Sequence, residues 1–460
     1  MYNLLMIIFS LGLPVLAGYC LIELLFFKNS GSGLLEKLAL SFGVGAGVLT
    51  LVMFILSLLK IRFTVLNITS TIFIIILPFL LVFIRSGKFS AHQAKSQGCR
   101  LSAIEISLVG IIILVSLYVF FQALITPLVV WDSWAIYGFK AKAFYLNKAV
   151  SLDFLTDPTK LYSHPDYPLL VPLIETWIYI CLNSWNDQLV KVIFPFYFIS
   201  LVIIFYHSLK YYIDKKLVLL FTLLLLTMPE LIFLGGSGYA DLPFTFYYFI
   251  SVVYLMRALS AGLDKRFLLI SSIFAGLSAW TKNEGLAVSL FNILILGLSI
   301  LFKLKLSRRN VFLFLEYVLI ICAIVIPWFW FKKYFGLSND VVKPDNLALP
   351  YIFSNLKRFP IILSYTGKSL FLFKSWNLFW LLSIGVIITN YKKLLVFPLL
   401  NILLSLMLYL GIWFFIYIIT PYDVNWHLAT SLSRLLLHIT PIVLFLDGIL
   451  IFSKPQGPKK

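Results

Sequence analysis

Long apolar runs, separated by short polar segments, recur from one end of the chain to the other. A run of about 20 residues is long enough for an α-helix to cross the ~30 Å hydrocarbon core of a bilayer. Because backbone amides find no water in that core, such runs predict helices, and they lack the ~10-residue alternation of a membrane β-barrel. The pattern predicts about thirteen crossings, at residues 3–27, 38–59, 64–84, 103–126, 188–207, 217–234, 242–258, 267–281, 285–302, 311–331, 369–389, 394–418 and 435–452.

Two of the connecting segments are long, at residues 127–187 and 332–368, and the first contains predicted helical stretches at 134–148 and 168–183. In the shorter loops, Lys and Arg gather on one side of the predicted bundle, which marks that side as cytoplasmic. This places the long loops and the N-terminus outside. We therefore expect an all-α, polytopic membrane protein, with N-terminal helices in residues 1–102, a main region at 103–452 and a cytoplasmic tail at 453–460.

Composition supports the membrane class. The chain of 460 residues is 61% hydrophobic and 12% charged, whereas soluble domains carry roughly 25% charged residues. A formal charge of +18 could indicate nucleic-acid binding, but the basic residues occur as short clusters between apolar runs, as topology signals do. We expect no nucleic-acid partner and a multi-pass protein of a bacterial cytoplasmic membrane.

Ionisable side chains at membrane depth cost about 2.5–3.5 kcal/mol each on insertion scales, so they are candidates for function. Five places on the predicted outer side carry them: "VVWDSWAIYG", "SHPDYPLLVP", "GGSGYADLPF", "SAWTKNEGLAV" and "WHLATSLSRLLLHITP". The candidate site residues are Asp132, Trp134, His164, Asp166, Tyr167, Asp241, Lys282, Glu284, Arg434 and His438.

Each place also has a purely structural interpretation. Asp132 and Asp241 precede predicted helices, where Asp is a common N-cap. The three prolines around His164 suit a rigid entry to an interfacial helix, Lys282 and Glu284 suit a charged turn, and an Arg at a helix end often snorkels. Together, however, several carboxylates, a Lys, an Arg and His side chains would converge on one membrane face.

Transfer of a sugar from a polyprenyl-phosphate carrier needs this set of groups. An acceptor hydroxyl needs a general base, which an Asp supplies. The departing lipid phosphate gains negative charge, which fixed cations stabilise best in a water-poor site. Lys and Arg both bind phosphate, and aromatic rings such as Trp134 and Tyr167 could pack on the sugar or the prenyl chain.

The order of these motifs resembles the GT-C superfamily of membrane glycosyltransferases, especially bacterial relatives of protein O-mannosyltransferases and of the lipid A aminoarabinose transferase. In that family an acid in the first long outer loop matches Asp132, a His/Pro stretch matches "HPDYP", and Asp-x-Pro matches Asp241 with Pro243. A "TK" turn with Gly matches Thr281, Lys282 and Gly285, and an Arg ahead of a Pro matches Arg434 and Pro441. The match covers roughly residues 103–452, with Ser133 where a second acid is usual and Asp166 where a Lys is usual.

The resemblance implies an inverting reaction with a polyprenyl-phosphate monosaccharide as donor and a glycan, lipid or protein as acceptor, at the outer face of the membrane. Asp132 would be the base, and Asp241, the second catalytic residue, would position hydroxyls of the acceptor or the sugar together with Asp166. Some family members use a divalent cation near the first-loop acid; Asp132 and Asp241 could supply oxygen ligands to Mg²⁺ or Mn²⁺, and no other cofactor is implied. The expected substrate-binding residues are Trp134, His164, Asp166, Tyr167, Lys282, Glu284, Arg434 and His438.

Two other classes of protein use intramembrane charges. A transporter or flippase of lipid-linked sugars would need them, but paired repeats are expected there and none is visible. An O-antigen polymerase or ligase shares large outer loops and arginines.

Overall fold

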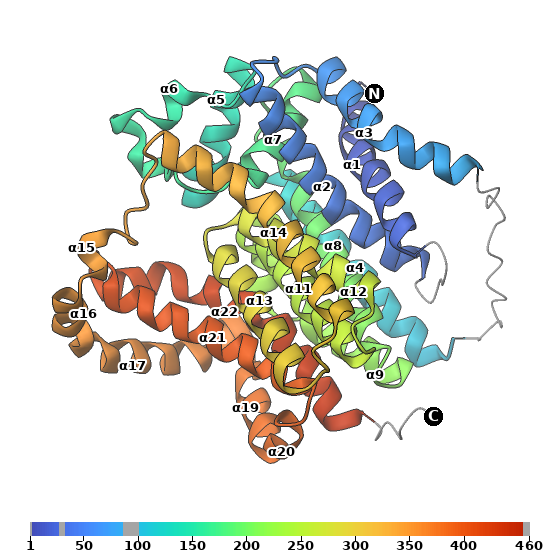
Figure 1. Cartoon of the computed structure of the whole chain (residues 1–460), viewed down its shortest axis with the longest axis vertical. Coiled ribbons are helices and arrows are strands. Elements are labelled where there is room, and N and C mark those ends of the chain that lie inside the picture. Colours follow the sequence, from blue (N-terminus) through green and yellow to red (C-terminus); the bar gives the residue numbers. More distant parts are fainter. Residues whose placement is uncertain (1, 27–32, 86–100, 454–460) are drawn as a thin grey trace.

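The computed structural model describes residues 2–26, 33–85 and 101–453 (Figure 1), and within these ranges every regular element is a helix. The all-helical fold class is confirmed. The predicted tail lies outside the described residues, apart from Ser453. The helices are α1 (Tyr2–Phe26), α2 (Leu34–Leu58), α3 (Val65–Arg85), α4 (Ala103–Ile125), α5 (Phe139–Asn147), α6 (Leu152–Leu155), α7 (Leu170–Leu182), α8 (Ile193–Leu209), α9 (Lys215–Leu226), α10 (Pro229–Ser237), α11 (Asp241–Ser260), α12 (Lys265–Thr281), α13 (Glu284–Phe302), α14 (Arg308–Tyr334), α15 (Pro344–Leu347), α16 (Leu349–Asn355), α17 (Phe359–Leu370), α18 (Phe373–Trp376), α19 (Phe379–Thr389), α20 (Tyr391–Leu394), α21 (Leu399–Ile419) and α22 (Val424–Phe452), with a π-helix at Asp132–Gly138 and 3-10 turns at Pro158–Ser163, Leu189–Val192 and Leu356–Arg358.

Among the described residues, nine helices are long and apolar enough to cross a membrane, or ten if α9 and α10, bent by 65°, count as one span. The chain is therefore a multi-pass membrane protein, but the predicted count of thirteen is not confirmed. Helices occupy all thirteen predicted ranges. The ranges that give no span hold α12 and α19, of 17 and 11 residues, the bent pair of α9 and α10, and α3, whose counted apolar part is Val65–Phe79. The spans are Tyr2–Glu23, Leu34–Leu58, Ala103–Ile125, Leu189–Leu209, Asp241–Ser260, Glu284–Phe302, Arg308–Tyr334, Leu399–Ile419 and Val424–Phe452.

Two predicted ranges differ from the observed helices. The range 369–389 is not one helix: α17 ends at Leu370, and α19 begins at Phe379 after Asn377 adopts a positive φ of 52°, which non-glycine residues rarely adopt. The range 435–452 is too short, because α22 starts at Val424, where the Asp423 side chain caps the helix by accepting from the Trp426 backbone N–H. Arg434 therefore lies inside a helix rather than at its end.

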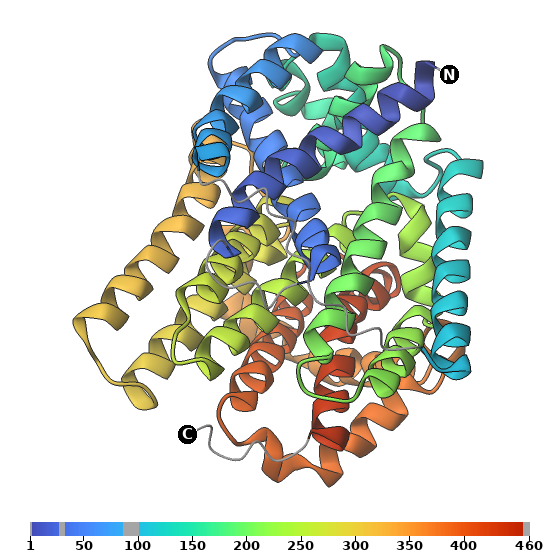
Figure 2. The same cartoon turned by 90° about the vertical axis from the view of Figure 1, so that its right-hand side faces the viewer.

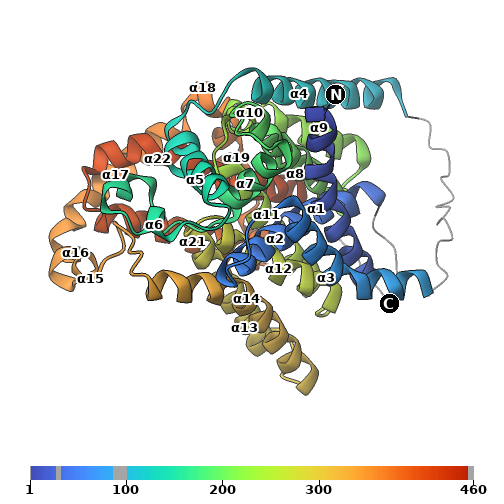
Figure 3. The same ribbon diagram turned by 90° about the horizontal axis from the view of Figure 1, so that it is seen from above.

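The bundle has a buried centre and a lipid-facing rim. The central helix α11 is buried along almost its whole length, and α22 is buried from Leu436 to Leu450, whereas α4 and α14 expose most of their side chains. Viewed along the vertical axis of Figure 1, α4 and α14 lie on opposite sides of the bundle (Figure 3). Exposed apolar side chains on rim helices fit a lipid environment, where burial against protein is not needed.

The first long loop forms a helical layer at one end of the molecule. The segments α5, α6 and α7 lie at the same end as the start of α1, while α20 and the end of α22 lie at the other end (Figures 1 and 2). The N-terminal helices pack into the same core: Trp177 Nε1 of α7 donates to the Ser10 carbonyl at 2.9 Å, and Tyr247 OH of α11 donates to the Gly43 carbonyl at 2.8 Å.

Small residues allow α1 and α2 to cross closely. A Cβ on Gly18 would lie 1.8 Å from the Ser41 carbonyl oxygen, and one on Gly45 would lie 1.7 Å from the Pro14 carbonyl oxygen. Backbones at this separation exclude any larger side chain, as in other membrane helix pairs. This crossing fixes α2, which packs against α8 and so supports the centre of the bundle.

Candidate active site

A buried carboxylate with three partners forms the centre of the site. Asp241 is the first residue of α11 and is 1% exposed. Its Oδ1 accepts from Lys282 Nζ at 2.8 Å and from His438 Nε2 at 3.0 Å, and its Oδ2 lies 3.4 Å from Arg434 Nη1. A charge withdrawn from water needs such partners. The carboxylate thus joins α11, the turn after α12, and α22.

Arg434 connects this centre to the first long loop. Asp132 begins the π-helix Asp132–Gly138, and its side chain accepts from the Arg434 guanidinium rather than capping the helix. Arg434 Nη2 also donates to the Thr430 carbonyl at 3.0 Å, and its guanidinium carbon lies 4.9 Å from the centre of the Tyr239 ring. These contacts hold the planar fork of Arg434 between two carboxylates that are far apart in sequence.

Lys282 lies in the turn between α12 and α13. Its side chain is 8% exposed, and Nζ lies 3.1 Å from Glu284 Oε1 as well as 2.8 Å from Asp241. The turn is tight because a Cβ on Gly285 would lie 2.1 Å from the Ser278 carbonyl. Lys282 is therefore a poorly solvated cation held between two carboxylates.

A buried tyrosine fixes the ring of His438. Because the Asp241 carboxylate can only accept, His438 Nε2 carries the hydrogen of this contact. In the neutral ring, Nδ1 then accepts from Tyr409 OH of α21, at 2.9 Å. Partners of this kind set which nitrogen is protonated. Tyr409 was not predicted, since an aromatic residue in an apolar helix carries no distinct sequence signal.

His164, Asp166 and Tyr167 form a second group beside the first. Asp166 accepts from Asn283 Nδ2 at 2.8 Å and from Asn339 Nδ2 at 2.7 Å. The His164 and Tyr167 rings stack with their centres 4.6 Å apart. Since Asn283 adjoins Lys282 in sequence, this group borders the charged centre. It joins the two long loops to the turn after α12.

Two residues that the sequence analysis did not select complete this second group. Asp340 accepts from Tyr422 OH and lies 3.8 Å from His164 Nδ1. Lys140 donates from Nζ to the His164 carbonyl at 2.5 Å, and burial lowers the pKa of Lys140 to about 7. The polar "SND" run in the second long loop was the available signal for Asp340.

Trp134 is not brought to the charged groups by any described contact. Its ring is exposed and lies 5.5 Å from that of Trp131. It therefore belongs to the aromatic surface of the first long loop, two positions after Asp132 in sequence.

The donor set suits an anion better than a divalent cation. Asp132 and Asp241 both bind Arg434, which lies between them, and Lys282 occupies Asp241 from another side. Within the described part of the chain, no group of three or more His, Cys, Asp or Glu side chains could hold a metal ion. A Mg²⁺ or Mn²⁺ ion between the two aspartates would have to displace Arg434, so these residues as arranged do not fit one.

Neither a protein-family model nor a curated protein sequence matches the chain. Among solved structures, the chain is similar to ArnT from Cupriavidus metallidurans bound to undecaprenyl phosphate, at 13% sequence identity and a TM-score of 0.45. The match covers 75% of this chain and 60% of the ArnT chain. A match at this distance fixes neither activity nor substrate nor partners.

Proposed function

We propose that the chain is an inverting glycosyltransferase that moves a monosaccharide from a polyprenyl-phosphate carrier to an acceptor glycan, lipid or protein. The observation that carries this proposal is the convergence of Asp132 and Asp241 with Lys282 and Arg434 in one group, at the border between the outer loops and the membrane helices. A carboxylate that can take a proton stands beside two cations that can bind a phosphate.

Asp132 is the better general base of the two aspartates. Its side chain is 17% exposed, whereas Asp241 is 1% exposed and saturated by three partners. Asp132 would take the proton of the acceptor hydroxyl as that oxygen attacks the anomeric carbon. The bond from this carbon to the phosphate oxygen breaks, and the phosphate leaves with the electron pair.

Lys282 and Arg434 would stabilise the leaving phosphate. A guanidinium carries five N–H donors and can bind carboxylate and phosphate together. Asp241 and His438 would then position these cations, while Glu284 orients Lys282. No step is assigned to a metal ion, because the residues as arranged do not fit one.

We place the site at the outer face of a bacterial cytoplasmic membrane. The first outer loop carries exposed aromatic side chains, among them Trp131, Trp134 and Trp185, and such residues gather at membrane interfaces. A donor whose prenyl chain remains in the lipid could then present its phosphate to Lys282 sideways, while the acceptor arrives from the aqueous side.

The decisive experiment compares variants in cells and in isolated membranes. We expect Asp132→Asn to abolish one sugar modification, detected by mass analysis of lipids, polysaccharides and proteins, while Asp153→Asn in the exposed part of the same loop leaves it unchanged. A full glycan profile in correctly folded Asp132→Asn would refute this role of Asp132. A flippase would instead leave transfer from preloaded outer-face donor unchanged in isolated membranes.

Phosphate binding is tested separately on the purified protein. Native mass spectrometry with undecaprenyl phosphate should show bound lipid for the parent and at least ~10-fold less for Lys282→Gln, a loss of about 1.4 kcal/mol. The matched control is Lys303→Gln, which removes an exposed lysine at the other end of α13. Equal binding by both variants would contradict the phosphate role of Lys282.

A further inference from the structure

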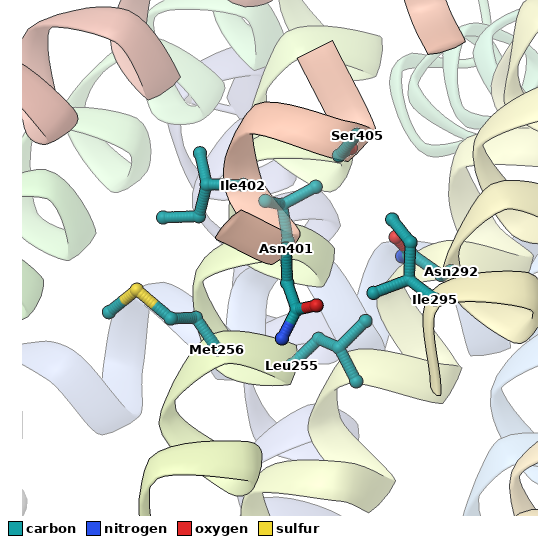
Figure 4. Close-up of a pocket in the computed structure, with 8 residues that line it drawn as sticks. Leu255, Met256, Asn292, Ile295, Asn401, Ile402 and Ser405 are labelled. Carbon is teal, nitrogen blue, oxygen red and sulfur yellow. The ribbon is translucent and has the colours of Figure 1, made fainter. Parts of the chain in front are cut away.

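A small cavity, lined mostly by apolar side chains with three polar residues among them, lies inside the bundle, away from the charged site. It has a volume of about 10 Å³ and lies between α11, α13 and α21 (Figure 4). Its first lining residue on α11, Val252, is eleven positions after Asp241, which is about 16 Å along a helix. The walls include the apolar side chains of Leu255, Ile295 and Ile402.

Two amide groups at this cavity are incompletely paired. Asn292 donates from Nδ2 to Ser251 Oγ at 3.1 Å, and Asn401 Oδ1 accepts from Ser299 Oγ at 3.4 Å. These bonds fix which end of each amide is left over. Among the described residues, Asn292 Oδ1 and Asn401 Nδ2 have no hydrogen-bond partner, although Asn292 is 0% and Asn401 8% exposed.

One orphan atom is an acceptor and the other is a donor, which is the pair of functions that a water molecule satisfies. We propose that the cavity binds one water molecule, which donates to Asn292 Oδ1 and accepts from Asn401 Nδ2. A volume near 10–15 Å³ is the least that holds a single water, and such a water needs two to four polar partners. The Ser405 hydroxyl, which also pairs with Tyr248 OH at 3.2 Å, lines the same cavity as a third partner.

This water would join helices that present the charged site. Asn292 is on α13, which begins at Glu284 directly after the Lys282 turn, and Asn401 is on α21, two turns before Tyr409. A bridge between them holds the two helices in register below the site. The inference does not depend on the proposed enzymatic activity.

A structure of the purified full chain, at a resolution that shows ordered waters, tests the proposal directly. We expect a density peak within hydrogen-bond distance of both Asn292 Oδ1 and Asn401 Nδ2. A map that shows waters at comparably buried sites but none here would overturn the proposal, as would a direct hydrogen bond between the two amides.

A double-mutant cycle gives an independent test by melting temperature. Either Asn292→Leu or Asn401→Leu removes one partner of the water. The melting temperature of the double variant should therefore be only slightly lower than that of the less stable single variant. Additive losses for the two asparagines would overturn the shared water, because independent sites add and sites that share a partner do not.

Discussion

Removing the charge of Asp241 should destabilise the protein far more than removing that of Asp132. Breaking a buried ion pair costs about 3–5 kcal/mol, because the surviving charge stays buried without compensation. In Asp241→Asn, however, Lys282 keeps Glu284 at 3.1 Å and Arg434 keeps Asp132. The asparagine also retains one acceptor oxygen, so we expect a loss of about 2–3 kcal/mol in the free energy of unfolding.

For Asp132→Asn the expected loss is smaller. The side chains of Asp132 and Arg434 are 17% and 18% exposed, and Arg434 keeps its contacts with Asp241 and with the Thr430 carbonyl. A partly solvated pair contributes about 1 kcal/mol. This difference makes Asp132→Asn the cleaner variant for the activity experiment, because loss of activity is less confounded by loss of fold.

The assay is thermal unfolding of the purified variants in detergent, combined with a cycle between Asp241→Asn and Lys282→Met. Because the two groups share one buried bond of 2.8 Å, the double variant should be less destabilised than the sum of the single ones by about 1–2 kcal/mol. The exposed Asp153→Asn should change stability by less than about 0.5 kcal/mol. Equal losses for Asp241→Asn and Asp132→Asn, with additive effects in the cycle, would refute the reasoning.

Three further predictions concern neighbouring residues. Tyr409→Phe removes the hydroxyl that pairs with His438 Nδ1. It should lower the free energy of unfolding by about 1 kcal/mol and lower activity in the membrane assay. Unchanged activity would contradict a positioning role for Tyr409. Gly285→Ala places a Cβ 2.1 Å from the Ser278 carbonyl and should lower the melting temperature and activity, while Gly297→Ala, which meets only Phe314 at 3.5 Å, should not. Burial lowers the pKa of Lys140 to about 7. At pH values between 7 and the ordinary pKa of a lysine side chain, the unfolded chain therefore binds more protons than the folded one. Stability of the parent relative to Lys140→Met should therefore rise with pH in this window, by at most about 1.4 kcal/mol per unit; a flat difference would contradict the buried neutral amine.

The charged centre could be predicted from sequence because its members interrupt apolar runs. A carboxylate or a lysine at membrane depth is expensive, so Asp241 and Lys282 stand out without any structural knowledge. Their contact depends on tertiary packing, and the structure brings them within 2.8 Å of each other. The roles assigned to them remain predictions, since geometry alone does not report chemistry.

Other parts of the site have no comparable signal. Tyr409 is one of several aromatic residues in the apolar sequence of α21 and gains its meaning only through His438. Asn339 lies in a long polar loop, where an asparagine is ordinary, and its bond to Asp166 joins residues 173 positions apart. Such contacts depend on how segments far apart in the chain pack together in three dimensions. Residue type and spacing along the sequence do not predict them.

The misplaced start of α22 shows how a polar stripe can hide a membrane helix. The segment from Val424 to Arg434 contains His, Thr, Ser and Arg, so its low hydropathy predicted a loop. Yet its polar residues His427, Ser431, Arg434 and His438 are spaced by four, three and four, which places them on one helical face. His427 contacts Thr420, Ser431 contacts Tyr417, Arg434 binds Asp132, and His438 binds Asp241. These four polar side chains thus lie along one face of α22, from the contact with the first long loop at Asp132 to the buried carboxylate of Asp241, and each has a partner. A single helix can therefore pack within the membrane and also present the polar residues of the site.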